Sequence, residues 1–376
     1  MKIGSSTKRP AAICAFAALL AACTPSGSRL TPNGGSMGSA DHHALDPTPG
    51  TARSRTLLTP PSVTLHFRHV YSTKPVKPNC CALQKTLFVS DAFGGSSFTG
   101  AVYAFDYNSG ASLGILAAPP EGWLEVQGAC ADDSGNVYFA NTEKSTIDEY
   151  SHSGTFITAL ADPNQYPVGC AFDRTTGNLA VSNIISVSGG PGSLSIYHDG
   201  VLQHVYLPPN MDRVYFLGYE DSTGILWLDG ENSSGLFQYD SFSGGTFVPV
   251  MITGGAIAFP GAVMWSGKTK TMVVGDQSTF SAPTFYQVDD AGHIVGETVL
   301  QCTQQSDFCD PVQATIKGPG LVSPDAAALG VARYAFPAGG SPILQYVAPY
   351  VQPIGSAVSP NKGTDEVRGS SDVFRT

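Results

Sequence analysis

Five oxygen-bearing side chains recur along this chain at intervals of 42 to 50 residues, each directly after a strand-like apolar stretch. They are Asp91, Asn141, Asn183, Asp229 and Asp276. If these strand ends met at one opening, their carboxylate and amide oxygens would suit a hard divalent cation such as Ca²⁺. The alternative, which we favour, is that each side chain caps its own strand by bonding nearby backbone.

Histidine is the second candidate for chemistry. His152 and His198 both lie in tight turns whose counterparts elsewhere carry Asp, so a turn role explains them. His66 and His69 are three positions apart, and on a strand an odd spacing directs two side chains to opposite faces. No grouping of Ser, Cys and His indicates nucleophilic catalysis.

The elements that position these residues are short strands in a repeat. Six times a bulky apolar residue is followed by a turn built on Asp, His, Ser or Pro and then by Gly, with 42 to 49 positions between successive copies. The leading residues are Phe105, Tyr150, Tyr197, Tyr239, Val288 and Phe336. This period is typical of a β-propeller with one copy per blade. We predict an all-β fold of six blades, with seven blades as the alternative.

The second and third repeats divide into four strands each. The expected strands are 126–131, 136–141, 145–150 and 155–160, then 167–173, 178–183, 193–197 and 202–206. Both repeats have the same order of features. A strand of small residues is followed by a turn, then by a strand that begins at Asn and ends in a second Asn. This pattern resembles NHL-type repeats. The resemblance implies a propeller and leaves the activity open.

The two ends of the predicted domain, 62–360, carry strand-like sequences that could close the ring. Pro353–Ser359 begins as the innermost strand at Pro167 does, and Val63–Tyr71 alternates in the manner of a strand. Pairing between N- and C-terminal strands removes open sheet edges. Residues 361–376 would form a tail or part of the closing strand, and a seventh blade would combine 63–71 with 353–376.

Glu121-Gly-Trp123 resembles the Glu-Gly-Pro motif of gluconolactonase-like hydrolases. This resemblance implies that one divalent metal is held on the propeller axis by Glu, Asn and Asp side chains. Here the motif precedes the second blade instead of the first and lacks the Pro. Asp229-Gly230 is no convincing counterpart of the family's later motif. Streptogramin-lyase-like propellers use His near the channel, and the turn positions of His152 and His198 do not support that role.

The N-terminus predicts export. A basic start and an apolar stretch over residues 11–22 are typical of a signal peptide, which we place at 1–22. Leu20-Ala21-Ala22-Cys23 resembles the lipobox of bacterial lipoproteins, which implies cleavage before Cys23 and lipid attached to it. The alternative is an ordinary secretory signal. Residues 23–61, rich in Ser, Gly and Pro, are expected to form a flexible tether.

Export makes disulfides the default use of the Cys residues. Cys302 and Cys309 bracket six residues in a long loop, and we predict a local bridge between them. The other four in the domain, Cys80, Cys81, Cys130 and Cys170, fall on expected innermost strands. Aligning the two glycines that precede them places Cys130 and Cys170 on opposite faces. Pairing of Cys80 or Cys81 with Cys130 stays open.

Charge restricts the partners. The formal net charge is −10, and without a basic cluster the chain is a poor nucleic-acid binder. No segment after the leader is long and apolar enough to span a bilayer. We expect a monomer in the bacterial cell envelope that touches a membrane through its lipid and faces the periplasm or the cell surface.

Three longer loops after second strands, at 93–98, 184–191 and 277–283, should emerge on one face of the ring. They carry the apolar residues Phe93, Phe98, Ile184, Ile185 and Phe280. Binding residues favour such loops on rigid scaffolds. The sequence therefore favours a binding module for a protein or glycan over the alternative, a divalent-metal-dependent hydrolase or lactonase at the channel.

Overall fold

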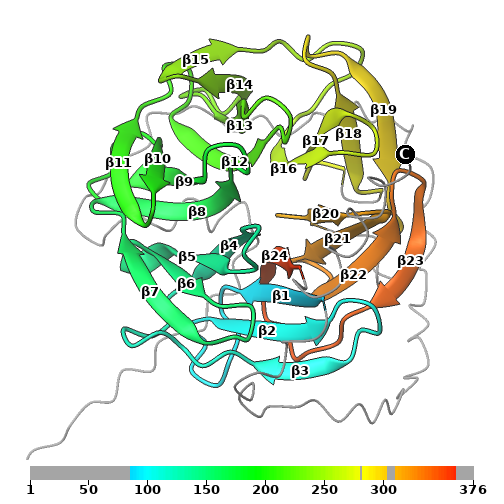
Figure 1. The fold of residues 1–376 in the computed structure, drawn as a ribbon. Coiled ribbons are helices and arrows are strands. Elements are labelled where there is room, and N and C mark those ends of the chain that lie inside the picture. The colour runs from blue at the N-terminus through cyan, green and yellow to red at the C-terminus, as the bar shows by residue number, and fades with distance from the viewer. Residues whose placement is uncertain (1–84, 280–281, 303–309, 361–376) are drawn as a thin grey trace, which may run out of the picture. The chain divides into compact units, whose positions relative to one another are not determined.

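The computed structural model describes residues 85–279, 282–302 and 310–360. These residues form six four-stranded sheets, and their only helix is the short 3-10 element η1 (Thr142–Lys144). The sheets stand around a common centre as the blades of a propeller (Figure 1). The prediction of an all-β, six-bladed propeller is confirmed, and the seven-bladed alternative is wrong.

Every blade has four strands, ordered from the centre of the ring outward. Blade 1 has β24 (Pro353–Ser359), β1 (Thr86–Asp91), β2 (Ala101–Asp106) and β3 (Ser112–Ile115). Blade 2 has β4 (Val126–Ala131), β5 (Val137–Asn141), β6 (Thr146–Tyr150) and β7 (Phe156–Ala161). Blade 3 has β8 (Gln165–Phe172), β9 (Asn178–Ser186), β10 (Ser193–His198) and β11 (Val201–Tyr206).

The remaining blades follow the same order. Blade 4 has β12 (Arg213–Tyr219), β13 (Leu226–Glu231), β14 (Phe237–Ser243) and β15 (Thr246–Pro249). Blade 5 has β16 (Pro260–Ser266), β17 (Thr271–Asp276), β18 (Thr284–Val288) and β19 (Ile294–Val299). Blade 6 has β20 (Thr315–Lys317), β21 (Gly320–Asp325), β22 (Gly330–Ala335) and β23 (Gly339–Gln345).

The repeated turn phrase lies between the third and fourth strand of every blade, as its spacing predicted. Its Gly takes a positive φ, for example 79° at Gly154 and 73° at Gly200. Glycine adopts this conformation without steric cost, whereas side chains with a Cβ rarely do. The Gly of the phrase is therefore what allows each outer hairpin to close.

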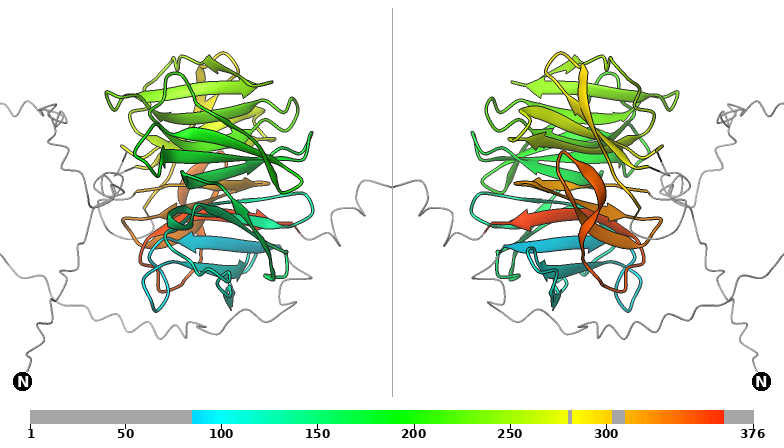
Figure 2. Two further views of the ribbon diagram at one scale, coloured as in Figure 1. Left: turned by 90° about the vertical axis from the view of Figure 1, so that its left-hand side faces the viewer. Right: turned by 90° about the vertical axis from the view of Figure 1, so that its right-hand side faces the viewer.

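Ring closure joins the two ends of the described chain. β24 pairs antiparallel with β1, from Thr86 opposite Ser359 to Phe88 opposite Ala357, and the two strands lie side by side in both views of Figure 2. Closure through N- and C-terminal strands is confirmed. The innermost place in blade 1 belongs to β24, although the sequence analysis placed Cys80 and Cys81 on such a strand. Those two residues and 63–71 lie outside the described residues.

The core lies between neighbouring blades. Phe88 of blade 1 meets Phe139 of blade 2 edge-on at 6.1 Å between ring centroids, and Trp123 stacks on Tyr150 at 5.7 Å. Second strands such as β1 and β17 are buried along their whole length, whereas outermost strands are largely exposed. No helix in the described part of the chain is long and apolar enough to cross a membrane.

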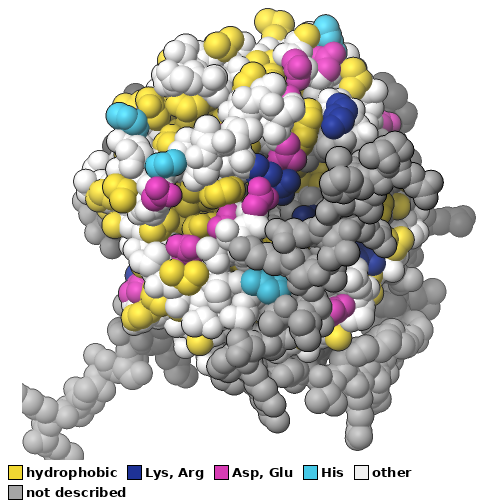
Figure 3. All heavy atoms as spheres, viewed as in Figure 1, with side chains coloured by type: hydrophobic (Ala, Val, Ile, Leu, Met, Phe, Trp, Pro, Cys, Tyr) yellow, Lys and Arg dark blue, Asp and Glu magenta, His cyan; other side chains and the backbone are white. Residues whose placement is uncertain are grey.

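Strand direction defines two faces of the ring. Connections from the second to the third strand lie on what we call the loop face. Connections from the first to the second strand, and from the third to the fourth, lie on the opposite turn face. Figures 1 and 3 look onto the turn face.

Candidate functional site

Asp91 lies buried at the loop-face end of β1. Its Oδ2 accepts a hydrogen bond from the Val351 N–H at 2.8 Å, and its Oδ1 accepts one from the Gln352 N–H at 2.7 Å. Burial raises the pKa of this carboxyl, and the backbone hydrogen bonds oppose that rise. Both amides belong to the connection that leads into β24, so Asp91 ties the two ends of the ring together.

Equivalent side chains bond the backbone of their own blades in the same way. Asn141 accepts from the Leu124 N–H at 2.8 Å, Asp229 from Phe216 at 3.0 Å, and Asp276 from Ala258 and Phe259 at 3.2 Å each. Asn183 differs, because its Nδ2 donates to the hydroxyls of Ser193 and Ser195 at 3.0 Å each.

Blade 6 has a sixth member of this set that the sequence analysis missed. Asp325 ends β21 and accepts a hydrogen bond from the Asp310 N–H at 2.9 Å. Pro324 directly before it weakened the strand pattern, because Pro is unusual inside a sheet. The blade period itself was the signal that could have located Asp325.

These six side chains do not fit a shared metal site. Each is held by groups of its own blade, and their oxygens accept from backbone amides or lie buried within the sheet. Among the described residues, no group of three or more His, Cys, Asp or Glu could hold a metal ion. The hydrogen bonds agree with the capping interpretation.

The residues of the gluconolactonase-like resemblance form a different arrangement. Burial, together with a hydrogen bond to the Glu121 carboxyl, raises the pKa of Asp148 to about 7. Asn141 donates from Nδ2 to Asp148 Oδ2 at 2.8 Å, while its own Oδ1 is already bonded to Leu124. A buried carboxyl whose pKa is raised, beside an amide that is already engaged, is a poor ligand set for a divalent metal, so we derive no step through one.

The predicted binding loops are only partly exposed. Phe98 is 65% exposed, whereas Phe93 and Ile185 are half-buried. Ile184 is buried, which corrects its assignment as a loop residue. Its strand, β9, continues to Ser186 and stays paired with β8 there. Phe280 lies outside the described residues.

Two further loop-face residues were missed from the sequence. Leu236 is 61% exposed between β13 and β14, and Leu329 is 46% exposed between β21 and β22. Phe98 and Leu329 also have positive φ angles of 55° and 51°, a conformation that costs about 1–2 kcal/mol for a residue with a Cβ. In the described chain, none of the five turns joining first to second strands carries an exposed large apolar side chain.

A cavity of about 640 Å³ lies at the opposite end of the ring, where the innermost strands reach the turn face. Small and apolar residues such as Ala129, Gly218 and Val263 form much of its wall. Its polar and charged lining consists of Arg174, Asp221, Lys268, Gln313, Thr315, Lys317 and Ser356. The cavity therefore has a mixed wall of small apolar and polar groups inside the ring and charged groups toward the turns.

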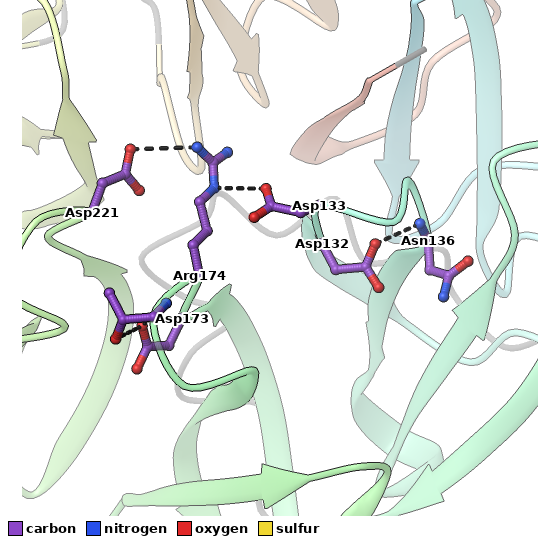
Figure 4. Close-up of polar contacts among 7 residues, drawn as sticks. Asp132, Asp133, Asn136, Asp173, Arg174 and Asp221 are labelled. Atoms are coloured by element: carbon purple, nitrogen blue, oxygen red, sulfur yellow. Dashed lines mark hydrogen bonds and ion pairs between the residues drawn. The ribbon is translucent and has the colours of Figure 1, made fainter. Parts of the chain in front are cut away.

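Arg174 connects three blades at this cavity. It follows β8, and its Nε lies 3.1 Å from Asp133 Oδ1 while its Nη1 lies 3.4 Å from Asp221 Oδ2 (Figure 4). The two acids occupy the corresponding turns of blades 2 and 4. All three side chains are about half exposed, so these ion pairs add little stability and exchange partners readily.

A disulfide between Cys130 and Cys170 joins innermost strands β4 and β8 and lines the same cavity. The sequence analysis placed these two residues on opposite faces, which is wrong. Both strands have register irregularities before the Cys, and one extra residue reverses the facing of those that follow. Cys302 is disulfide-bonded. Cys309 lies outside the described residues, so their pairing stays a prediction.

Comparison with known proteins supports the architecture. The chain matches no family model and no curated protein by sequence. A solved chain from a nidogen/laminin complex is similar at a TM-score of 0.59 and 12% identity, covering 74% of this chain and 99% of that one. A Bacteroides caccae protein of unknown function is similar at 0.54 and 13%, covering 73% and 99%. A streptogramin B lyase reaches 0.43 at 13%, covering 60% and 69%, too distant to bear on function. These likenesses show the fold alone, and with the six sheets they identify the chain as a six-bladed β-propeller.

Proposed function

We propose that this protein is a lipid-anchored binding module that holds a protein partner against its loop face. The observation that carries the proposal is the exposure of Phe98, Leu236 and Leu329 on loops of one face. The three side chains stand on blades 1, 4 and 6 of that face, so one partner broad enough to span the ring would cover all of them. Two of the three are held in a left-handed conformation, and backbone strain of this kind concentrates at functional sites.

The frame behind these loops supports the proposal. Buried side chains such as Asp91 and Asp276 fasten the loop-face ends of the blades through backbone hydrogen bonds. A loop on a rigid frame loses less conformational entropy when it binds, which favours affinity. The fold-level likeness to a chain of a nidogen/laminin complex adds that this architecture occurs in a protein–protein assembly.

The test is a site-specific photo-crosslink in cells. A benzophenone amino acid at position 98 should give a saturable adduct with one protein, and the same group at Val201, an equally exposed outer-strand residue, should not. A glycan partner would instead give retention on polysaccharide without a protein adduct, and that result would overturn the proposal.

A matched pair of triple variants separates binding from folding. Phe98→Asn, Leu236→Ser and Leu329→Asn remove the apolar side chains, and Asn tolerates the left-handed conformation at 98 and 329. The control set changes the exposed outer-strand residues Val201, Val295 and Ile343 to Ser. We expect at least a tenfold loss of affinity for the crosslinked partner in the first set only. Equal losses in both sets would contradict a loop-face site.

The anchor is tested separately. The wild-type chain should incorporate a clickable palmitate analogue and sediment with membranes, whereas Cys23→Ser should do neither. Sedimentation of Cys23→Ser with membranes as efficiently as the wild type would contradict a lipid anchor at this residue. It would leave the loop-face proposal intact.

A further inference from the structure

We infer that the turn-face cavity binds a small organic anion, with an apolar body inside the ring and a carboxylate or phosphate group at its charged end. This site lies at the end of the ring opposite the loop face. The inference therefore stands independently of the proposed function.

The first argument is the sign of the charge. The whole chain has 20 Lys and Arg against 30 Asp and Glu, yet the described lining of the cavity carries Arg174, Lys268 and Lys317 against Asp221, with Asp133 beside Arg174 at the rim. Figure 3 shows Lys and Arg near the middle of this face, with Asp and Glu beside them. A local excess of positive charge with low-dielectric walls attracts anions, and the acidic remainder of the surface repels them.

The second argument is the size and chemistry of the wall. A volume of about 640 Å³ lies within the range of roughly 300–1,000 Å³ that small-molecule sites occupy. Trp265, Met264 and Tyr219 line it beside small residues and the Cys130–Cys170 disulfide. The wall also includes polar groups inside the ring, such as Gln313 and Ser356, so it mixes apolar contact area with groups that can fix a ligand's orientation.

Lys268 and Arg174 can offer hydrogen-bond donors to a bound anion without breaking the fold. Lys268 Nζ donates to the Phe336 carbonyl at 2.9 Å, and an ammonium group has three donors. Arg174 is engaged only in exposed ion pairs with Asp133 and Asp221, which are weak enough to exchange. A bound anion would take one donor from each side of the opening.

The experiment uses a matched pair of fluorescent probes with the purified chain lacking only its leader and Cys23. 1-Anilinonaphthalene-8-sulfonate carries an anionic sulfonate, which stands in for the carboxylate or phosphate. N-Phenyl-1-naphthylamine has the same aromatic frame without the charge. We expect saturable 1:1 binding of the first at least fivefold tighter than the second, with energy transfer from Trp265. Trp265→Phe should remove a larger share of that transfer than Trp123→Phe or Trp227→Phe, which would locate the probe, and equal losses in the three variants would overturn the inference.

Charge variants test the role of the cations. Lys268→Gln and Arg174→Gln should each lower the affinity for the anionic probe at least threefold. The affinity for the neutral probe should change by less than twofold. The control is Lys270→Gln, in the same turn but outside the cavity lining, which should change neither. Equal effects at 268 and 270, or on both probes, would show nonspecific attraction and overturn the inference. Thermal unfolding checks that every variant is folded.

Two further experiments identify the head group and the source of the anion. Hexanoate and hexyl phosphate as competitors distinguish a carboxylate from a phosphate preference, and displacement by neither contradicts the inference. A chain ending at Pro360 tests residues 361–376, which include Asp365 and Glu366. Binding by the truncated chain alone would show that the protein's own C-terminal segment competes for the cavity, and it would overturn binding of a free ligand by the intact protein.

Discussion

The two faces of the ring are held together by different chemistry. At the loop face, buried side chains such as Asp91 and Asp276 accept hydrogen bonds from backbone amides, and apolar residues such as Phe98 stand exposed above them. At the turn face, Arg174 joins three blades through exposed ion pairs, and a disulfide crosses the wall of a cavity.

This difference separates what builds the ring from what is free to bind. Buried, hydrogen-bonded carboxylates are costly to disturb, because breaking the bond leaves polar groups without partners. Exposed ion pairs can be rearranged at almost no cost. The loop face is therefore rigid beneath its exposed residues. The turn face has buried carboxylates of its own, such as Asp132 and Asp173, which accept hydrogen bonds from turn amides, but the ion pairs of Arg174 above them stay free to exchange. Substitutions at the two faces should break or sharpen this division.

Removal of the disulfide should have the largest effect. Cys130 and Cys170 are 40 positions apart, and a cross-link over a loop of this length stabilises by about 4 kcal/mol in the chain-entropy treatment. Chemical denaturation of Cys130→Ser/Cys170→Ser should show a loss of that order. Because reduction also breaks the disulfide of Cys302, the unchanged chain under reducing conditions should lose at least as much stability as the double variant. A loss below about 1 kcal/mol in the double variant would mean that the blades are locked elsewhere.

Asp91→Ala should come next, with a loss of about 3 kcal/mol, because it removes two hydrogen bonds to a buried carboxyl and leaves the Val351 and Gln352 amides unpaired. Protection of these amides from hydrogen exchange should fall with it. If protection from exchange fell only in blade 1 and the free energy of global unfolding did not change, the role of Asp91 in closing the ring would be contradicted.

Stability should depend on pH through the loop-face end of blade 2. Burial, reinforced by the neighbouring Glu143, raises the pKa of Glu125 to about 7, and burial with the Glu121 carboxyl does the same for Asp148. In the unfolded chain such groups titrate near pH 4, so the folded state binds more protons between these values. Their stabilising contribution is complete below about pH 4 and is lost as the pH rises through about 7.

We therefore expect the free energy of unfolding to be about 2 kcal/mol higher at pH 6 than at pH 8, measured by denaturation at both values. Glu125→Gln/Asp148→Asn should remove the share that blade 2 contributes, whereas Asp310, whose pKa burial also raises to about 7, should keep its own share. Asp289→Asn, at an exposed turn, is the matched control and should leave it unchanged. Stability that rises between pH 6 and pH 8 would contradict the assignment.

The smallest effect should come from the turn face. Asp221→Ala breaks one of the two exposed pairs of Arg174 and should change stability by less than about 0.5 kcal/mol, as should Arg174→Gln. Comparison with Asp91→Ala in the same denaturation series measures the contrast between the faces directly. A loss above about 2 kcal/mol at Arg174 would show that the ion pairs hold the blades together.

The fold was predictable from the sequence because its signals are local. The Gly of each repeated turn is needed for a positive φ within a few residues, and alternation along the flanking strands follows from the pleat. Closure by residues 353–359 was predictable for the same reason, since their pattern matches that of another innermost strand. Asp91, Asn141, Asp229 and Asp276 accept hydrogen bonds from backbone amides, as the capping interpretation expects, whereas Asn183 bonds Ser hydroxyls instead and Asp325, after its Pro, was missed.

The site was less predictable because it depends on which face of its strand each side chain occupies and on distances around the ring. A register irregularity in β4 and in β8 was enough to misplace Cys130 relative to Cys170. Ile184 is buried because its strand continues for three residues beyond the predicted end at 183. Leu236 and Leu329 were missed because exposure is a property of packing.

Residues close together in the chain were enough to determine the class of this protein: an all-β propeller of six blades, an expected export signal with Cys23, and strand-end caps. Tertiary structure was needed to decide which side chains meet. Arg174 reaches acids 41 and 47 positions away in two other blades, and six innermost strands enclose one cavity. The blade period places these residues in corresponding turns, but only the curvature of the closed ring brings their side chains within reach of one another.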